Sequence, residues 1–517
     1  MLKRIALRLA TVLAAITIVV GSGLAPAQAA SKTITLLDSF DIKDWDPAVI
    51  YSSEVRTLLN VYETLTHYNS ETGEAEPLLA TDWTVSDDGL TWIFNLRKGV
   101  MFHDGTPFNA AAAKASLDRT IEIDGGAAYI WSSVEEISAP SEHSLVIKTE
   151  YPMPLNLVAT SQYGAYMLSP AAGAKGADWL QEGNAAGTGP YKVRQWDKGQ
   201  QLVMEKFDDY WGGWSDDQFD RIIVRFVAEV STQVQMLRTG EADLMLSTAP
   251  ADMLDKLQAE PGITLSVFES WLNIPLMINS KLYPTDNRKF RQALTYLMDY
   301  EAIGRDIYGG YGIVPKSCIP QSMWGAGQYD MPTLDIAKAR QLLEESGIPE
   351  SDWKVTYHAY TGRQEIGQIS ELFQALAAQA GVEVDLQIGE WGVLWDKQKR
   401  LETSANMFAV LWWADWPTPT GWLEAMWHSE EPILFNFAHY DNPEYDRVLD
   451  EGIKLQGSDR AAAIAKFEEA QGIVLDDAVA MCLVDLKKTV LHRTNLTGVF
   501  YNAAYETVSI YDLRRAE

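Results

Sequence analysis

The most distinctive hydrophobic pattern of the chain is the apolar run at residues 408–413, F-A-V-L-W-W. Its length and aromatic content predict a strand that is buried on both faces. Pro417 and Pro419 follow shortly afterwards and prevent the strand from continuing. One acid, Asp415, stands where the strand is expected to end. Three tryptophans flank this acid in the sequence: Trp412, Trp413 and Trp416.

A carboxylate among indole rings loses much of its hydration, which costs several kcal/mol unless a cation and hydrogen-bond donors replace the water. The cation at Asp415 is either a lysine or arginine of the protein itself or the ammonium group of a ligand in a tryptophan-walled cleft. The local sequence leaves both alternatives open.

The N-terminal part of the chain has a pattern typical of hairpins. A first strand is expected at 32–37 and a helix near 54–65. Strands joined by Asp-Gly turns are expected between 80 and 108, followed by a helix that Asn109 caps.

Beyond about residue 275 the pattern changes to alternating helices and strands. Gly347 and Gly381 end two of the predicted helices, and Pro443 and Ser458 stand at the start of two more. The predicted helices include 335–346, 366–380 and one that ends near 401, and the predicted strands include 382–388 and 479–484. Since open α/β sheets bind ligands beyond the ends of their strands, we expect a site in the loop after residue 413.

Residues 1–29 have the features of a cleavable signal peptide. A basic segment with Lys3, Arg4 and Arg8 precedes an apolar stretch and an A-x-A cleavage site that ends at Ala29. No later run of about 18 apolar residues is present. We therefore expect a soluble protein that is exported to the periplasm.

Net charge and size narrow the function classes. Removing the three basic residues of the signal peptide changes the formal charge from −29 to −32. Such a charge repels phosphate backbones and anionic lipids, which disfavours nucleic-acid or membrane-surface binding. The length of 517 residues predicts two or three domains. Cys318 and Cys482 form either one disulfide or two buried thiols, and the sequence leaves this open.

A long motif at residues 83–108 carries a family resemblance. The pattern W-x-x-S-x-D-G-x-T-W-x-F-x-L-R-x-G-V-x-F-H-D-G-x-P-F resembles the signature of the family 5 extracellular solute-binding proteins of ABC importers. Further segments that resemble this family follow in the same order: 187–191 (G-T-G-P-Y), 209–213 (D-Y-W-G-G), 237–243 (L-R-T-G-E-A-D) and 287–303.

The resemblance implies an α/β fold of the periplasmic binding protein type (type II, cluster C). This fold has two lobes and an extra β-rich subdomain in the first lobe. The expected segments are 1–29 as signal peptide, 30–78 as the first part of lobe 1, 79–186 as the β-rich subdomain, 187–272 as the second part of lobe 1, 273–488 as lobe 2, and 489–517 as the return to lobe 1.

Motifs for catalysis are missing from the sequence. It contains no G-x-S-x-G, Walker, G-x-G-x-x-G or H-E-x-x-H pattern, and its seven histidines lack metal-ligand spacing. We therefore expect no enzyme activity, no cofactor and no metal site, and we favour a structural role for His103. Seven of the 18 tryptophans lie between residues 391 and 427, and among these Trp395 and Trp427 are expected in the core.

The resemblance gives the expected site residues their roles. In peptide binders of the family, a W-x-x-D segment supplies the aspartate that pairs with the α-amino group of the peptide, and residues 412–415 match it. Trp391 matches a cleft tryptophan, and Trp271 begins the strand that crosses into the second lobe. Tyr51 and Ser52 are also expected to contact the ligand.

Tyr300 stands where the family usually has arginine, and a second departure from the family pattern concerns the expected site. A binder of tripeptides to pentapeptides carries an arginine for the far carboxylate on the tryptophan strand, where this chain has Ala409. Arg363 and Arg400 are the candidates that replace it.

These features together predict a periplasmic receptor of an ABC importer. It is expected to be a monomer that captures short peptides or peptide-like amines between its lobes and delivers them to the permease subunits in the inner membrane. The alternatives are an oligosaccharide receptor of the same fold, since tryptophans also bind sugar rings, and, from another class, a secreted hydrolase.

Overall fold

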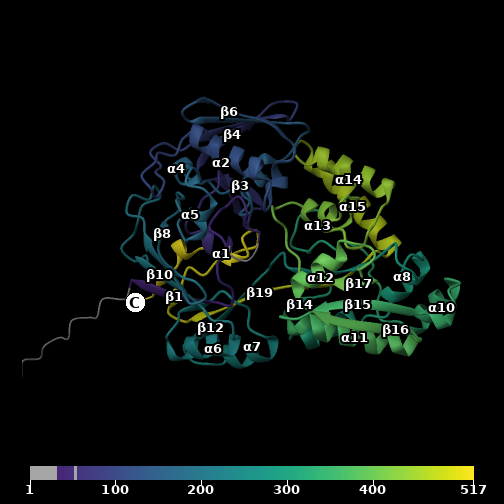
Figure 1. The fold of residues 1–517 in the computed structure, drawn as a ribbon. Coiled ribbons are helices and arrows are strands. Elements are labelled where there is room, and N and C mark those ends of the chain that lie inside the picture. The colour runs from purple at the N-terminus through teal and green to yellow at the C-terminus, as the bar shows by residue number, and fades with distance from the viewer. Residues whose placement is uncertain (1–31, 52–54, 517) are drawn as a thin grey trace, which may run out of the picture.

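The structure is a computed structural model that describes residues 32–51 and 55–516. The predicted signal peptide, residues 1–29, lies outside the described residues. The first half of the molecule, on the left in Figure 1, is built on a seven-stranded sheet in the order β12-β19-β11-β1-β10-β9-β8. Its strands are β1 (Thr33–Asp38), β8 (Tyr191–Asp197), β9 (Gln201–Lys206), β10 (Arg221–Phe226), β11 (Leu244–Met245), β12 (Ile263–Phe268) and β19 (Lys488–Arg493).

The first strand forms where the apolar pattern predicts it. β1 runs parallel to β10 and to β11 and buries Ile34 and Leu36 completely. Helices α6 (Val230–Thr239) and α7 (Ala251–Gln258) cover one end of this sheet around Leu37. The expected helix near 54–65 is much shorter, because α1 spans only Val55–Leu58 within the described residues.

A four-stranded antiparallel sheet of order β4-β5-β7-β6 lies above this region in Figure 1. Helix α2 (Ala110–Ile123) packs on it, and the side chain of Asn109 accepts a hydrogen bond from Ala112 N at 3.0 Å, which confirms the predicted cap. Gly89 adopts φ +74° in the predicted Asp-Gly turn. The strands are β4 (Ala80–Val85), β5 (Thr91–Leu96), β6 (Val134–Ser141) and β7 (Ser144–Thr149).

The second half of the molecule, on the right in Figure 1, is built on a six-stranded sheet in the order β14-β18-β13-β17-β15-β16. Its strands are β13 (Asn273–Ile278), β14 (Gly312–Ile313), β15 (Lys354–Tyr360), β16 (Glu383–Gly389), β17 (Met407–Ala409) and β18 (Ala480–Leu486). Its helices are α8 (Arg288–Thr295), α9 (Tyr300–Ala302), α10 (Ile336–Glu345), α11 (Gln364–Ala380), α12 (Trp391–Gln398), α13 (Thr420–Trp427), α14 (Pro443–Leu455) and α15 (Arg460–Asp477).

Shorter strands and α-helices lie between and after these elements. They are β2 (Thr66–Asn69), β3 (Glu74–Pro77), α3 (Leu155–Val158), α4 (Pro170–Gly173), α5 (Ala177–Gln181), β20 (Leu496–Thr497), β21 (Tyr501–Asn502), β22 (Thr507–Val508) and β23 (Arg514–Arg515). No helix of the described residues combines the length and the apolar character needed to cross a membrane.

Two predictions for the second half need correction. The strand expected at 408–413 spans only Met407–Ala409. Beyond it the chain still bonds to β13, through Val410 N to Pro275 O at 3.1 Å and through a bridge between Trp412 and Asn273, but these contacts do not continue the regular strand. The second correction concerns α15, which is capped by Asp459 and not by Ser458, since the Asp459 carboxylate accepts from Ala462 N at 3.0 Å.

The two large sheets are joined by two short chain segments. One leads from β12 to β13 through residues 269–272, and the other leads from β18 to β19 through Lys487. The two segments lie side by side, because Leu486 N donates to Leu272 O at 2.8 Å. The division of the chain into domains stays a prediction, but these segments are the places where the chain passes from one large sheet to the other.

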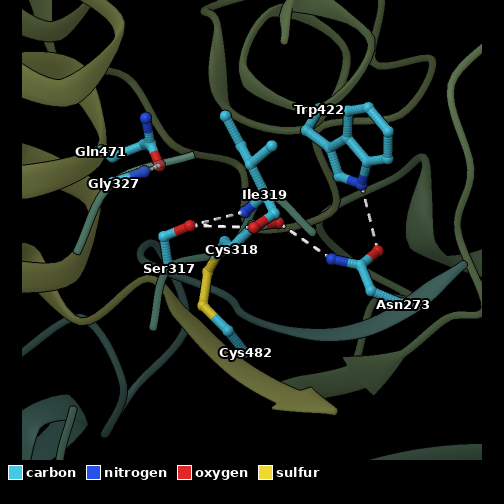
Figure 2. The surroundings of a disulfide bond; sticks show 8 residues. All are labelled: Asn273, Ser317, Cys318, Ile319, Gly327, Trp422, Gln471 and Cys482. Atoms are coloured by element: carbon cyan, nitrogen blue, oxygen red, sulfur yellow. Dashed lines mark hydrogen bonds between the residues drawn. A yellow bond between two sulfur atoms is a disulfide. The ribbon is translucent and has the colours of Figure 1, made fainter. Parts of the chain in front are cut away.

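A disulfide joins Cys318 to Cys482 on β18, which answers the question that the sequence left open (Figure 2). The backbone around it is fixed as well. Asn273 Nδ2 donates to Cys318 O at 2.9 Å, and Trp422 Nε1 donates to Asn273 Oδ1 at 3.0 Å. Since Asn273 also pairs with Trp412, the disulfide and the loop that carries Asp415 belong to one hydrogen-bonded network.

Candidate functional site

Asp415 lies where the two halves of the molecule meet. Its carboxylate accepts hydrogen bonds from the hydroxyl groups of Tyr129 and Tyr51, the latter at 3.2 Å. Its backbone oxygen accepts from Ser161 Oγ at 2.6 Å. All three donors precede residue 190, whereas Asp415 follows β17 of the six-stranded sheet. This contact therefore holds the two halves together.

The electrostatic state of Asp415 follows from its surroundings. Burial raises the pKa of its carboxyl group to about 6, and the hydrogen bonds from Tyr129 and Tyr51 limit this rise. Burial, together with the nearby Asp415, also raises the pKa of the Tyr129 hydroxyl. In the described part of the chain no lysine, arginine or histidine forms an ion pair with Asp415. Two neutral tyrosine hydroxyl groups therefore contact Asp415 where a cation is expected from the sequence.

Aromatic rings from both halves surround this acid. Phe435 is the central ring: it stacks on Tyr51 with centroids 6.1 Å apart, and it packs edge-on against Trp412 at 5.5 Å. Tyr129 lies edge-on to Trp416 at 5.8 Å. Because these rings exclude water, any charge that enters here interacts with Asp415 more strongly than it would in solvent.

The three tryptophans beside Asp415 differ in their contacts. Trp412 and Trp416 are buried, with 8% and 7% of their surface exposed, and Trp412 Nε1 donates to Gly421 O at 2.8 Å. Trp413 is partly exposed and its Nε1 donates to Tyr163 OH at 3.0 Å, a further bond between the halves. The role of these rings as a ligand-binding surface stays a prediction.

The more distant tryptophans lie in different surroundings. Trp391 is 36% exposed and packs edge-on against Tyr360 at 4.5 Å. Trp271 is buried beside Tyr68 at 5.2 Å, in the segment that joins the two sheets. Trp427 is fully buried, as predicted, and Trp395 is half-buried against Phe437.

The two candidate arginines are both exposed. Arg363 precedes α11, and its charge reaches the junction of the halves. At this junction burial lowers the pKa of Lys488. The negative charge of Glu506 opposes this effect, and the positive charge of Arg363 adds to it. Arg400 follows α12, and no hydrogen bond or ion pair within the described residues joins its guanidinium to Asp415. Ser52 lies outside the described residues, and Ala409 is fully buried.

A cavity of about 990 Å³ also lies between the halves. The segment 59–78 and the C-terminal segment 500–512 line it from one side, and Ser322, Trp324 and Arg460 line it from the other. Of the nine predicted ligand contacts that the structure describes, only Trp271 lines this cavity. Thr160 and Gln162 also line it, whereas Ser161 between them bonds to Asp415.

Sequence reasoning missed four residues of the site: Ser161, Tyr129, Tyr163 and Phe435. Tyr129, Ser161 and Tyr163 precede Asp415 by more than 250 residues, and helix α13 separates Phe435 from Asp415 in the chain. No local pattern marks them, because only the packing of the two halves brings them together. No three His, Cys, Asp or Glu residues within the described ranges form a group that could hold a metal ion.

Two sheets joined by two short segments, with an acid and a cavity between them, define a two-lobed binding protein. Residues 74–432 match the model of the bacterial extracellular solute-binding proteins, family 5, and the chain belongs to this family. This confirms the resemblance found in the sequence.

Similar proteins span nearly the whole chain. The glutathione-binding protein GsiB of Escherichia coli (strain K12) is 28% identical over 482 residues, which cover 91% of this chain and 90% of GsiB. The same identity and coverage hold for GsiB of Shigella flexneri. These relatives are named as binding proteins and not as enzymes.

Solved structures confirm the predicted fold class. The periplasmic binding protein DppA of Helicobacter pylori, in complex with the peptide STSA, superimposes with a TM-score of 0.80 at 24% identity and covers 94% of this chain and 98% of that one. The dipeptide-binding protein of Pseudoalteromonas sp. SM9913, in complex with Met-Leu, has a TM-score of 0.81 at 21% identity and covers 93% and 100%. These names do not favour the oligosaccharide alternative.

Proposed function

We propose that this protein is the periplasmic receptor of an ABC importer and that it captures short peptides or peptide-like amines between its lobes. In this proposal the α-ammonium group of the ligand binds Asp415, and the closed receptor delivers the ligand to the membrane permease. The protein changes no bond of its ligand. Family membership and the names of the relatives support the receptor role.

One observation carries the choice of ligand. Asp415 is a carboxylate at the junction of the lobes whose side-chain partners are two neutral hydroxyl groups, Tyr51 and Tyr129. Its pKa of about 6 means that at neutral pH the group is mostly ionised in surroundings that disfavour its charge. An incoming ammonium group supplies the missing positive charge, and the aromatic walls strengthen the attraction by excluding water.

The energy required is modest. Micromolar binding corresponds to about −8 kcal/mol. A charge-assisted hydrogen bond to Asp415, backbone hydrogen bonds to the peptide and contact with aromatic rings together supply an energy of this order. Ligand contacts with both lobes exist only when the lobes meet, so binding shifts the equilibrium toward the closed form.

Calorimetry with matched ligands tests this function. The peptide Ala-Ala-Ala is titrated into the purified protein at pH 7.5 beside its N-acetylated form, which has the same backbone but no ammonium group. We expect acetylation to weaken binding at least about tenfold, the loss of one charge-assisted contact. Equal affinities for the two forms would refute the ammonium role, and the absence of any peptide binding would refute the peptide-receptor function. Native mass spectrometry of protein purified from its own cell identifies the ligand independently.

A further inference from the structure

The cavity of about 990 Å³ is a compartment distinct from the contact at Asp415. Its volume is at the upper end of the range found for small-molecule sites. Ser161 bonds to Asp415, while its neighbours Thr160 and Gln162 line the cavity. One segment of three residues therefore contacts both places.

Aromatic rings form much of the cavity wall. Tyr68 and Trp271 meet edge-on there with centroids 5.2 Å apart, and Trp324 contributes from the second lobe. Three more aromatic side chains complete this part of the wall: Phe268, Tyr501 and Tyr505. The faces of such rings are negative and attract cations.

Two buried amide side chains at the cavity have oxygens without partners. Gln162 and Asn60 are 3% and 1% exposed, and both residues line the cavity. Neither Gln162 Oε1 nor Asn60 Oδ1 accepts a hydrogen bond from any residue that the structure describes. Because these oxygens are themselves buried behind the cavity wall, a ligand in the cavity does not reach them, and the charges of the lining decide which ligand it favours.

The charges around the cavity are predominantly negative. Five acids line it: Glu63, Glu71, Glu76, Glu269 and Asp512. Arg460 is the one lysine or arginine among the described lining residues, and it is already paired with Glu74 at 2.9 Å and placed over the ring of Trp324. A cavity lined in this way repels anions and concentrates cations.

We propose that this cavity binds a cationic part of the ligand, such as a lysine or arginine side chain. The inference rests on the proposed function, because it places in this cavity a side chain of the peptide whose α-ammonium group binds Asp415. An acidic side chain would meet the carboxylates at the rim. An apolar one would leave these carboxylates without a positive partner.

Three peptides of equal length separate these cases by calorimetry at low salt: Ala-Lys-Ala, Ala-norleucine-Ala and Ala-Glu-Ala. Norleucine keeps the unbranched apolar chain of lysine but lacks its charge. We expect the lysine peptide to bind about threefold more tightly than the norleucine peptide and at least about tenfold more tightly than the glutamate peptide. Added salt reduces these ratios because the rim carboxylates are exposed.

Charge-neutral variants locate the effect. Glu71 and Asp512 are exposed at the rim, so the double variant Glu71→Gln/Asp512→Asn is expected to fold, and it should reduce the lysine-to-glutamate ratio at least threefold. The matched control is Glu135→Gln/Asp178→Asn, which removes two exposed acids that do not line the cavity and should leave the ratio unchanged.

The outcomes distinguish this inference from the function on which it rests. Equal affinities for the three peptides, or tighter binding of the glutamate peptide, would overturn the cationic preference while the peptide receptor stands. The absence of binding by all three peptides would contradict both. A control variant that lowers the ratio as much as the rim variant would show that the cavity is not the source of the preference.

Discussion

Two acids of this protein have similar partners but different positions. Glu63 accepts hydrogen bonds from Tyr210 OH at 2.8 Å and Trp211 Nε1 at 3.0 Å, and burial raises its pKa to about 7. Asp415 accepts from Tyr129 and Tyr51, and burial raises its pKa to about 6. In both places aromatic donors replace the water around a carboxyl group.

The difference lies in where the donors come from. Tyr210 and Trp211 belong to the same lobe as Glu63, so these bonds form when that lobe folds. The donors to Asp415 belong to the opposite lobe, so these bonds form only when the lobes meet. Glu63 also has Arg97 nearby, which lowers its pKa, whereas no ion pair within the described residues reaches Asp415. Similar chemistry thus serves stability in one place and closure in the other.

The largest expected effect separates the two acids by stability. Glu63→Ala leaves the Tyr210 hydroxyl and the Trp211 indole without their acceptor and should lower the free energy of unfolding by about 2 kcal/mol. Asp415→Ala should change it by less than about 0.5 kcal/mol, since its donors are exposed to water whenever the lobes open. Urea unfolding followed by circular dichroism measures both.

Glu63→Gln is the control for this comparison, because an amide oxygen still accepts a hydrogen bond and should restore most of the lost stability. If Asp415→Ala destabilised the fold as much as Glu63→Ala, Asp415 would be a structural residue and the distinction between the two acids would disappear.

The second effect is a pH dependence of peptide binding. Closure raises the pKa of Asp415, so the protonated acid favours the closed form without ligand, and this contribution is lost as the pH rises through about 6. An ammonium ligand needs the ionised acid. When the ligand-free protein is closed, a proton must leave Asp415 below pH 6 before the amine binds, and the affinity of this form should fall about tenfold for each further pH unit.

Calorimetry of Ala-Ala-Ala between pH 5 and 7.5 measures this dependence, with the N-acetylated peptide as the matched control. Binding of the acetylated peptide should be nearly independent of pH over this range, because no ammonium group pairs with Asp415. The same pH dependence for both peptides would assign the titration to another group, such as Glu63.

Much of the fold follows from local sequence patterns. Asn109 and Asn442 cap the helices expected after them, and Gly381 ends α11 at φ +89°. The strand predicted at 408–413 is too long by comparison, since apolar character alone does not show that the pairing with β13 becomes irregular after Ala409. Burial there comes from helix packing and from the facing lobe.

The candidate site could be predicted only in part. Asp415 and its tryptophans stand in one continuous motif, which made them visible in the sequence. Tyr129 and Ser161 come from distant segments, and nothing in their neighbourhood indicates that they meet an acid of the other lobe. The disulfide cannot be predicted from the sequence for the same reason, because the approach of Cys318 to Cys482 depends on the tertiary fold.

The measurement that tests the account most directly is the binding of Ala-Ala-Ala to Asp415→Asn and to the wild type at pH 7.5. Asparagine keeps the size and one acceptor oxygen but removes the charge. The account predicts that the variant binds this peptide at least about tenfold more weakly and binds the N-acetylated peptide with nearly unchanged affinity. Equal affinity of both proteins for Ala-Ala-Ala would contradict the claim that Asp415 receives the ammonium group of the ligand.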